Sequence, residues 1–219
     1  MIKIAHIAAR LIEQMPFIAE ALQAGLINIS ALAREIQPEV SRRAGRPVQA
    51  GAIVMAIQRM PAVGLVQSER SLAHFFRSLQ DMSVRSDLLD YTFQNSETLS
   101  VRQAQLLAQI GRRPKVFYSV SRGIAETTLL IARTFEAEVD ELFSGEKLLS
   151  KEGNLNAITL MLPAENRQIF GIYYHILRQL AWQGINVVEV VSTSNEFTIV
   201  VGDEDLEQAF AVLAQLRQA

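Results

Sequence analysis

The chain of 219 residues contains no cysteine. This absence excludes disulfide bridges, catalysis by a thiolate and zinc sites built on thiolates, so the fold has to rest on packing alone. A chain without cysteine suits a reducing compartment, and we therefore expect a cytoplasmic protein.

A membrane-spanning apolar run is also missing from the sequence. The N-terminal stretch is apolar in places, but Arg10, Glu13 and Glu20 interrupt it, and no cleavage site of small residues follows. We therefore expect neither a signal peptide nor a contact with the membrane.

The usual patterns of catalytic and metal-binding residues are absent as well. No glycine-rich phosphate loop precedes a lysine, and no nucleophile, base and orienting group can be assembled. The three histidines, His6, His74 and His175, are too scattered to form a metal-binding motif. The sequence thus predicts a protein that is not an enzyme and that has no cofactor and no metal.

Charge is distributed unevenly along the chain. Residues 1–86 carry ten Lys and Arg against six Asp and Glu, whereas residues 87–219 carry eleven against seventeen. The opposite net charges indicate two functional parts.

The first part has helical periodicity. Apolar residues from Leu11 to Leu22 recur at spacings of three and four, which predicts one helix that Gly25 ends. Ser30 is expected to cap a second helix, and Pro38 to end it. A helical module over residues 1–86 follows from these patterns.

A basic loop and a third helix complete this module. The loop carries Arg42, Arg43 and Arg46, and Pro47 is expected at the first position of the helix. Three short helices resemble a helix-turn-helix or winged-helix unit, in which these arginines would contact nucleic acid. The third helix is apolar nearly all round, which instead favours burial in a core or an oligomer interface.

From residue 87 the pattern changes to alternating strands and helices. We predict strand 87–94, helix 97–113, strands 115–121 and 126–132, and helix 136–143. The same order then returns as strand 155–162, helix 169–184, strands 186–192 and 196–203, and helix 203–218. A repeat of about seventy residues predicts two α/β sandwiches, over 87–152 and 153–219, each an antiparallel sheet with helices on one face.

The second repeat resembles the ACT domain at the regulatory end of aspartokinases. Shared features are a glycine that opens the first helix, a Gly-Ile-Asn before the second strand, a Ser-Thr-Ser at its end, and an acidic start to the last helix; here these are Gly171, Gly184 to Asn186, Ser192 to Ser194, and Asp203 onward. Residues 1–86 show nothing that resembles the kinase domain, and Phe170 replaces the usual proline before the glycine.

This resemblance implies an α+β fold in which a helical module precedes two ferredoxin-like ACT units of βαββαβ order. It also implies that a small-molecule effector, most often an amino acid, binds between paired units, and that the protein is a homodimer. The residues expected to bind the ligand are Glu165, Asn166, Gln168, Gly171, Ser192, Ser194, Asn195 and Glu196.

Elementary chemistry supports part of this set. A helix start offers unpaired N–H groups and the positive end of the helix dipole to a carboxylate, and Gly171 permits close approach. Ser, Thr and Asn also favour turns because they bond to nearby backbone, so Ser192 to Glu196 could be a turn and nothing more. The equivalent turn of the first repeat, with Ser119, Ser121, Arg122 and Gly123, is open to the same two interpretations.

The sequence therefore predicts a non-catalytic sensor of an amino acid or a similar metabolite. Its helical module would pass effector binding to DNA, as in a transcriptional regulator, or to an enzyme of amino-acid biosynthesis on which it docks as a regulatory subunit or scaffold.

Overall fold

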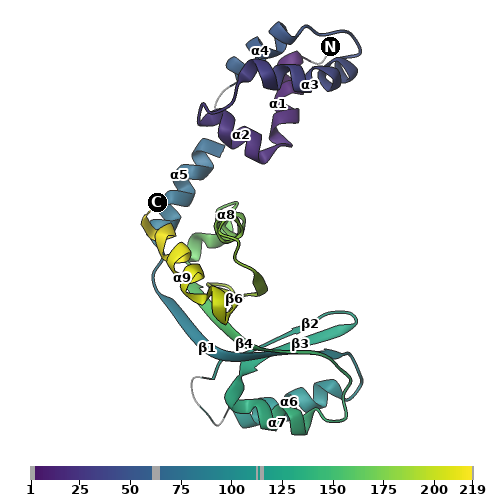
Figure 1. The fold of residues 1–219 in the computed structure, drawn as a ribbon, viewed down its shortest axis with the longest axis vertical. Helices are drawn as coiled ribbons and strands as arrows, with labels where there is room; N and C mark the ends of the chain where they lie inside the picture. The colour runs from purple at the N-terminus through teal and green to yellow at the C-terminus, as the bar shows by residue number, and fades with distance from the viewer. Residues whose placement is uncertain (1–2, 61–64, 112, 114–115, 219) are drawn as a thin grey trace. The chain divides into compact units, whose positions relative to one another are not determined.

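The chain divides into two compact units, which we call the helical unit (Met1–Arg70) and the sheet unit (Ser71–Ala219). The computed structural model describes residues 3–60, 65–111, 113 and 116–218 (Figure 1). Arg112 of the predicted helix 97–113 and Lys115 of the predicted strand 115–121 lie outside these ranges. The predicted boundaries at 86/87 and 152/153 fall inside strands β1 (Met82–Gln94) and β4 (Leu148–Met161), and the division into three domains stays a prediction.

The helical unit consists of α1 (Ile4–Glu13), α2 (Pro16–Gln23), α3 (Ile29–Ala44), α4 (Ala50–Gln58) and the start of α5 (Leu65–Arg77). Its core lies mainly between α1, α3 and α4, where Leu11, Ile36 and Ile53 are buried. The described residues before residue 71 contain helices and no strand, so they show no wing beside the helices.

Two predicted helix boundaries in this unit are wrong. The helix expected across Leu11 to Leu22 is two helices, because Pro16 begins α2, and proline is favoured at a first helical position. Ser30 is not the cap of α3, since the side chain of Asn28 accepts a hydrogen bond from the Ala31 N–H at 3.0 Å. An asparagine satisfies this unpaired donor as well as a serine does.

The expected end of the next helix is also wrong. Pro38 lies inside α3, which continues to Ala44 and ends at Gly45 in the left-handed conformation (φ 67°). Arg42 and Arg43 therefore belong to the last turn of α3 and not to a loop. Helix α4 begins at Ala50, three residues after the predicted Pro47.

The sheet unit contains one antiparallel sheet with the strand order β2-β3-β1-β4-β6-β5. Its other strands are β2 (Tyr118–Arg122), β3 (Glu126–Ala132), β5 (Val187–Ser192) and β6 (Glu196–Gly202), and its helices are α6 (Leu99–Ile110), α7 (Glu136–Leu142), α8 (Ile172–Trp182) and α9 (Leu206–Gln215). The predicted order of strands and helices is confirmed in both repeats.

The two central strands are shared between the repeats. The second half of β1 pairs with β3 and with the first half of β4, and the second half of β4 pairs with β6 and with the first half of β1. The first repeat is thus β2-β3-β1-β4 and the second is β5-β6-β4-β1, each with the ferredoxin-like strand order. The last strand of the second repeat comes from residues 82–85, before the first repeat begins.

Each shared strand contains a bulge where it passes from one repeat to the other. The register shifts between Arg85 and Leu88 on β1, and again between Leu88 and Asp90 opposite β4. Asp87 (φ 61°) and Asn154 (φ 57°) adopt the left-handed conformation there, which Asp and Asn tolerate better than most residues. One extra residue reverses which side chains face each side of a strand.

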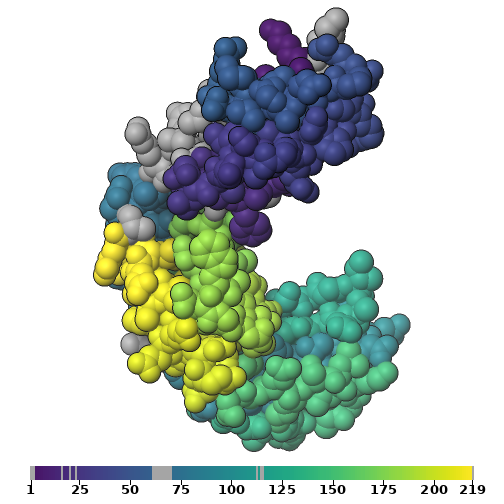
Figure 2. All heavy atoms as spheres, turned by 45° about the horizontal axis from the view of Figure 1, so that its top comes forward, coloured from purple at the N-terminus to yellow at the C-terminus, as the bar shows by residue number. Residues whose placement is uncertain are grey.

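This reversal lets one strand serve two cores. On β1, Met82 and Val84 pack against the core under α8 and α9, whereas Leu89, Tyr91 and Phe93 belong to the core under α6 and α7. Helices α8 and α9 lie side by side, as Figure 2 also shows in light green and yellow.

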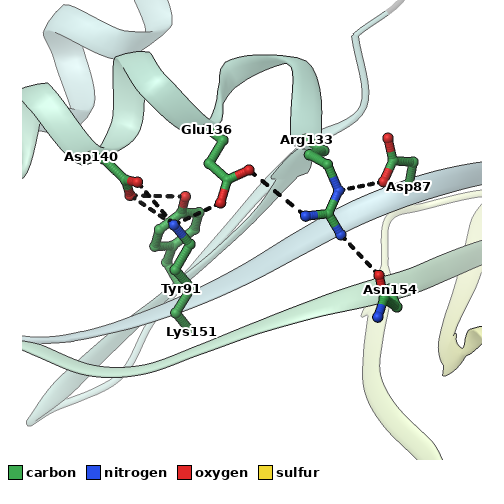
Figure 3. A network of polar contacts seen from close by, with 7 residues as sticks. All are labelled: Asp87, Tyr91, Arg133, Glu136, Asp140, Lys151 and Asn154. Carbon is green, nitrogen blue, oxygen red and sulfur yellow. Dashed lines mark hydrogen bonds and ion pairs between the residues drawn. The ribbon is translucent and has the colours of Figure 1, made fainter.

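Arg133 connects the two bulges. Its side chain contacts Asp87 at 2.5 Å and the Asn154 amide oxygen at 3.1 Å, and lies 3.7 Å from Glu136 (Figure 3). Lys151 of β4 forms a second group of ion pairs with Glu136 and Asp140 beside it. These contacts hold together the points on β1 and β4 at which each strand passes from one repeat to the other.

A third apolar cluster lies on the sheet face opposite the helices and is shared by both repeats. It contains Leu88, Leu130, Leu155, Ala157 and Val200. All five side chains are buried although no helix contributes to the cluster, because the sheet is curled.

The second half of α5 belongs to the core of the second repeat. Phe75 and Phe76 are buried there, and the Phe76 ring packs against His175 of α8 with centroids 4.9 Å apart. The interpretation of these two phenylalanines as core residues is confirmed. Among the described residues, no helix is long and apolar enough to cross a membrane.

Candidate functional site

A pocket of about 420 Å³ lies at the start of α8 in the second repeat. Its lining consists of Asn166, Arg167, Ile169, Phe170, Gly171, Ile172, Tyr173 and Tyr174. The pocket is therefore formed by the loop between β4 and α8 and by the first turn of α8. Most of its surface is apolar, with an amide and a guanidinium at one end.

Gly171 is the residue before the first turn of α8. It has φ 84°, a conformation that a side chain makes unfavourable, so the sequence requires glycine for a backbone reason. The helix start faces the pocket with the positive end of its dipole, which suits an anionic group. A Cβ added to Gly171 would lie 3.9 Å from Leu72 of α5, and Leu72 belongs to the same buried cluster as Ile172 of α8.

The loop before α8 is held against the hairpin between β5 and β6. The Asn166 amide donates to the Ser194 carbonyl at 2.8 Å, and Arg167 donates to the Ser194 hydroxyl at 2.7 Å. Tyr173 and Ser192 share a hydrogen bond of 2.9 Å. The structure thus brings together the two segments, residues 165–171 and 192–196, that the sequence predicts to form one site.

Part of the polar hairpin serves its own turn. The Glu196 N–H donates to the Thr193 hydroxyl at 3.2 Å, and the Thr193 N–H donates to the Glu196 carbonyl at 3.0 Å. Thr193 therefore acts as a turn residue. The Ser194 hydroxyl accepts from a pocket residue, whereas the Ser192 hydroxyl contacts both a pocket residue and the Thr193 and Glu196 carbonyls of its own turn.

The predicted ligand residues separate into three groups. Asn166 and Gly171 line the pocket, and Ser192 and Ser194 contact residues that line it. The remaining predicted residues, which are Glu165, Gln168, Asn195 and Glu196, are not part of its described lining. The ligand role of the whole set stays a prediction.

Six residues of the pocket lining are absent from the predicted set, and two of them bear on ligand binding. Arg167 brings a positive charge to the lining, and Tyr173 stacks on Phe197 with ring centroids 4.5 Å apart. Tyr173 was expected in a core or an interface, and its side chain is 45% exposed. An arginine four residues before a helix-opening glycine was a usable signal, because it places a cation beside the anion-binding end of a helix.

The equivalent turn of the first repeat is occupied by internal contacts. Arg122 donates to the Ser100 hydroxyl of α6 at 2.6 Å, and the carbonyls of Gly123 and Ile124 accept from the Asn95 amide at 2.9 and 3.0 Å. Ser119 and Ser121 lie on β2. A ligand role for this turn also stays a prediction.

Three carboxylates gather on the sheet face opposite the helices. Burial, with a smaller contribution from Glu152 directly across the strand pair, raises the pKa of Asp90 to about 6. Burial and then the Asp90 charge raise the pKa of Glu189. Among the described residues, no group of three or more His, Asp or Glu side chains is placed to hold a metal ion.

The arginines predicted to contact nucleic acid differ in their surroundings. Glu39 forms ion pairs with Arg42 at 2.6 Å and Arg43 at 2.5 Å, and these hydrogen bonds lower the pKa of Glu39 to about 2. Arg46 is exposed in the loop after α3. On the exposed side of α4, the Met55 side chain is 47% accessible, so α4 is not buried all round.

Comparison with known proteins identifies the fold of the sheet unit. No protein-family model and no curated protein sequence matches the chain. The regulatory subunit of aspartate kinase from Thermus thermophilus is 11% identical with a TM-score of 0.53, covering 64% of this chain and 98% of that one. The corresponding subunit from Thermus flavus is 11% identical with a TM-score of 0.50, covering 63% and 97%.

The aspartate kinase of Clostridium acetobutylicum gives a third match, with 11% identity and a TM-score of 0.52 over 63% of this chain and 34% of that one. At these identities the likeness concerns the fold. The predicted resemblance to the regulatory ACT region of aspartokinases, with an α+β fold after a helical module, is confirmed at that level.

Proposed function

We propose that this protein is a non-catalytic regulator that binds a small carboxylate effector, an amino acid, in the pocket at the start of α8. The observation that carries the proposal is the position of Arg167. Its guanidinium lies in the pocket lining beside the α8 N-terminus, so two sources of positive potential converge on one apolar cavity. The shared fold of aspartate kinase regulatory subunits supports the same function.

The pocket has a direct connection to the helical unit through the chain. Helix α5 begins at Leu65 in the helical unit, and its second half packs in the core of the second repeat. Leu72 of α5 belongs to the same buried cluster as Ile172 in the first turn of α8, and Phe76 packs on His175 of α8. A ligand that alters the start of α8 would therefore act on α5 first.

Self-association as a homodimer is part of the proposal. Strands β2 and β5 end the sheet, and within the described residues each pairs with a neighbour on one side only. Free strand edges are suited to pairing with a second copy.

Stabilisation by ligand tests the proposed function. Each of the twenty common L-amino acids is added to the purified chain, and the midpoint of thermal unfolding is measured. A ligand at 100 times its dissociation constant should raise the free energy of unfolding by about 2.7 kcal/mol. Ammonium acetate at the same concentration is the control, and sedimentation of the same samples reports the dimer. If no amino acid stabilises the protein, the effector proposal is wrong.

The partner of the helical unit is either DNA or a biosynthetic enzyme. Exposed Arg46, with Arg42 and Arg43 beside it, supports DNA, whereas the accessible Met55 on α4 supports docking on a protein. If the partner is DNA, the anisotropy of a labelled duplex should report binding that weakens steeply from 50 to 200 mM salt, because neutralised phosphates release counterions. Absence of binding at 50 mM salt would exclude DNA and leave the enzyme.

A further inference from the structure

The two repeats form the same corner at the end of their first strand. Hydroxyl pairs join Thr92 to Thr128 at 3.2 Å and Thr159 to Thr198 at 2.7 Å at matching places in the two sheets. In both repeats an asparagine amide then donates to carbonyls of the facing hairpin, from Asn95 in the first and from Asn166 in the second. The α6 start in the first repeat therefore corresponds to the α8 start in the second.

Backbone hydrogen bonds extend this correspondence to the neighbouring strand. The Gln94 N–H donates to the Lys147 carbonyl at 2.9 Å, and the Met161 N–H donates to the Asp81 carbonyl at 3.0 Å. Gln94 and Met161 are the last residues of β1 and β4. Glu146, which precedes Lys147, thus corresponds to Gln80, which precedes Asp81.

In the first repeat the carboxylate of Glu146 occupies the helix start. It accepts hydrogen bonds from the Ser96 hydroxyl at 2.6 Å and from the Thr98 hydroxyl at 2.7 Å. The Ser96 hydroxyl in turn accepts from the Leu99 N–H, the first residue of α6, at 3.0 Å. These hydroxyl bonds, Ser96 first, lower the pKa of Glu146. The anion-binding end of α6 is therefore already satisfied by the chain itself.

The second repeat differs from the first in the residue that corresponds to Glu146 and in the length of the connection before its first helix. Gln80 is neutral and exposed, and it supplies no carboxylate. The connection from β4 to α8 spans residues 162–171 and forms the pocket, whereas only residues 95–98 separate β1 from α6. Arg167 lies in the longer connection, and Arg122 of the first repeat is bonded to Ser100. One repeat is closed around an internal carboxylate and the other is open.

We infer that Glu146 is a built-in occupant of the first repeat's carboxylate position, so that the chain takes one external carboxylate ligand, at the second repeat. The expected stoichiometry of one external ligand per chain rests on the proposed function. The first repeat then acts as a permanently occupied copy of the second, and the removal of Glu146 should leave a vacancy that a small free carboxylate can fill.

Chemical rescue tests the vacancy without knowledge of the effector. The variant Glu146→Ala is expected to lower the midpoint of thermal unfolding by about 2–4 °C, the shift typical of one lost interaction in a chain of this size. Sodium acetate at 100 mM should restore about half of this loss, relative to sodium chloride at equal ionic strength. The wild type, in which acetate can bind at the second repeat alone, gives the baseline difference between the two salts, and the rescue is the excess over this baseline.

Two further variants sharpen the test. Glu146→Gln keeps the volume and the acceptor oxygen, so acetate should stabilise it no more than it stabilises the wild type, and this variant tests the site if the alanine variant does not fold. Glu141→Ala, an exposed change on α7, is the matched control and should respond to acetate as the wild type does. An effect of acetate on Glu146→Ala that is no larger than its effect on the wild type would overturn the inference.

Calorimetry on the wild type supplies the second criterion. With any amino acid that stabilises the protein, we expect one molecule bound per chain, and two per chain would overturn the inference. If no amino acid binds while acetate still rescues Glu146→Ala, the effector proposal fails and the internal carboxylate stands.

Discussion

Replacement of Arg167 by glutamine is expected to weaken effector binding by about 10- to 100-fold. A hydrogen bond to a charged group contributes about 1.5–3 kcal/mol, and 1.4 kcal/mol corresponds to a factor of ten. The guanidinium is held in the pocket lining by its bond to the Ser194 hydroxyl, so its position does not depend on the ligand. Titration calorimetry with the amino acid that stabilises the wild type measures the change.

Arg122→Gln is the matched control for this variant. Arg122 occupies the corresponding corner of the first repeat and also donates to a serine hydroxyl, at 2.6 Å. Its loss should leave the affinity within a factor of two, because the first repeat is closed by Glu146. Equal weakening by both variants, or by Arg122→Gln alone, would show that the ligand does not bind at the second repeat alone.

Leu88→Ala is expected to lower the free energy of unfolding by about 3 kcal/mol. Buried leucine-to-alanine changes cost about 2–5 kcal/mol through lost transfer energy and the cavity left behind. Leu88 is 1% exposed and lies opposite Leu155 in the cluster that both repeats share. Urea unfolding followed by far-UV circular dichroism measures the loss.

The shared cluster also predicts the shape of the transition. Because Leu130 and Val200 of different repeats pack in the same cluster, both repeats should lose stability together in one transition. Leu107→Ala, at a leucine that is 53% exposed on α6, should change stability by about 0.5 kcal/mol or less. Loss of the β-sheet signal in two steps, with only one step displaced by Leu88→Ala, would contradict a common core.

The order of strands and helices in the sheet unit was predictable because each element carries its own periodicity. The short apolar runs of β3 and β6 and the spacing of apolar residues in α8 are local signals, and the structure follows them. The resemblance at Gly171 and at Ser192 to Ser194 correctly predicted that these segments meet. The secondary structure of each of these segments was therefore predictable from its own sequence.

The shared strands were not predictable in the same way. Residues 82–85 form only a short alternating stretch, and their partner, residues 157–160, lies more than seventy positions away. The bulges at Asp87 and Asn154 reverse the alternation, so each strand contradicts a single pattern along its length. Long-range pairing of this kind leaves no local signal.

The helical unit shows a different source of error. Pro38 was expected to end a helix, but its side chain is exposed and α3 continues for six residues beyond it, because Ile36 and Val40 on either side are buried in the core. Tertiary packing overrides the local preference at Pro38. Arg167 was overlooked because it lies in a short 3-10 helix (Ala164–Gln168), where periodicity carries no information.

The sharing of β1 and β4 between the repeats has a consequence for the evolution of the fold. Deletion of either repeat would cut both β1 and β4 in the middle of the strand, since each of these strands has one half in each repeat. The pair is therefore the smallest segment that evolution can transfer intact to another protein. A duplicated ancestor with this arrangement could lose ligand binding in one copy, as Glu146 indicates for the first, but it could not discard that copy.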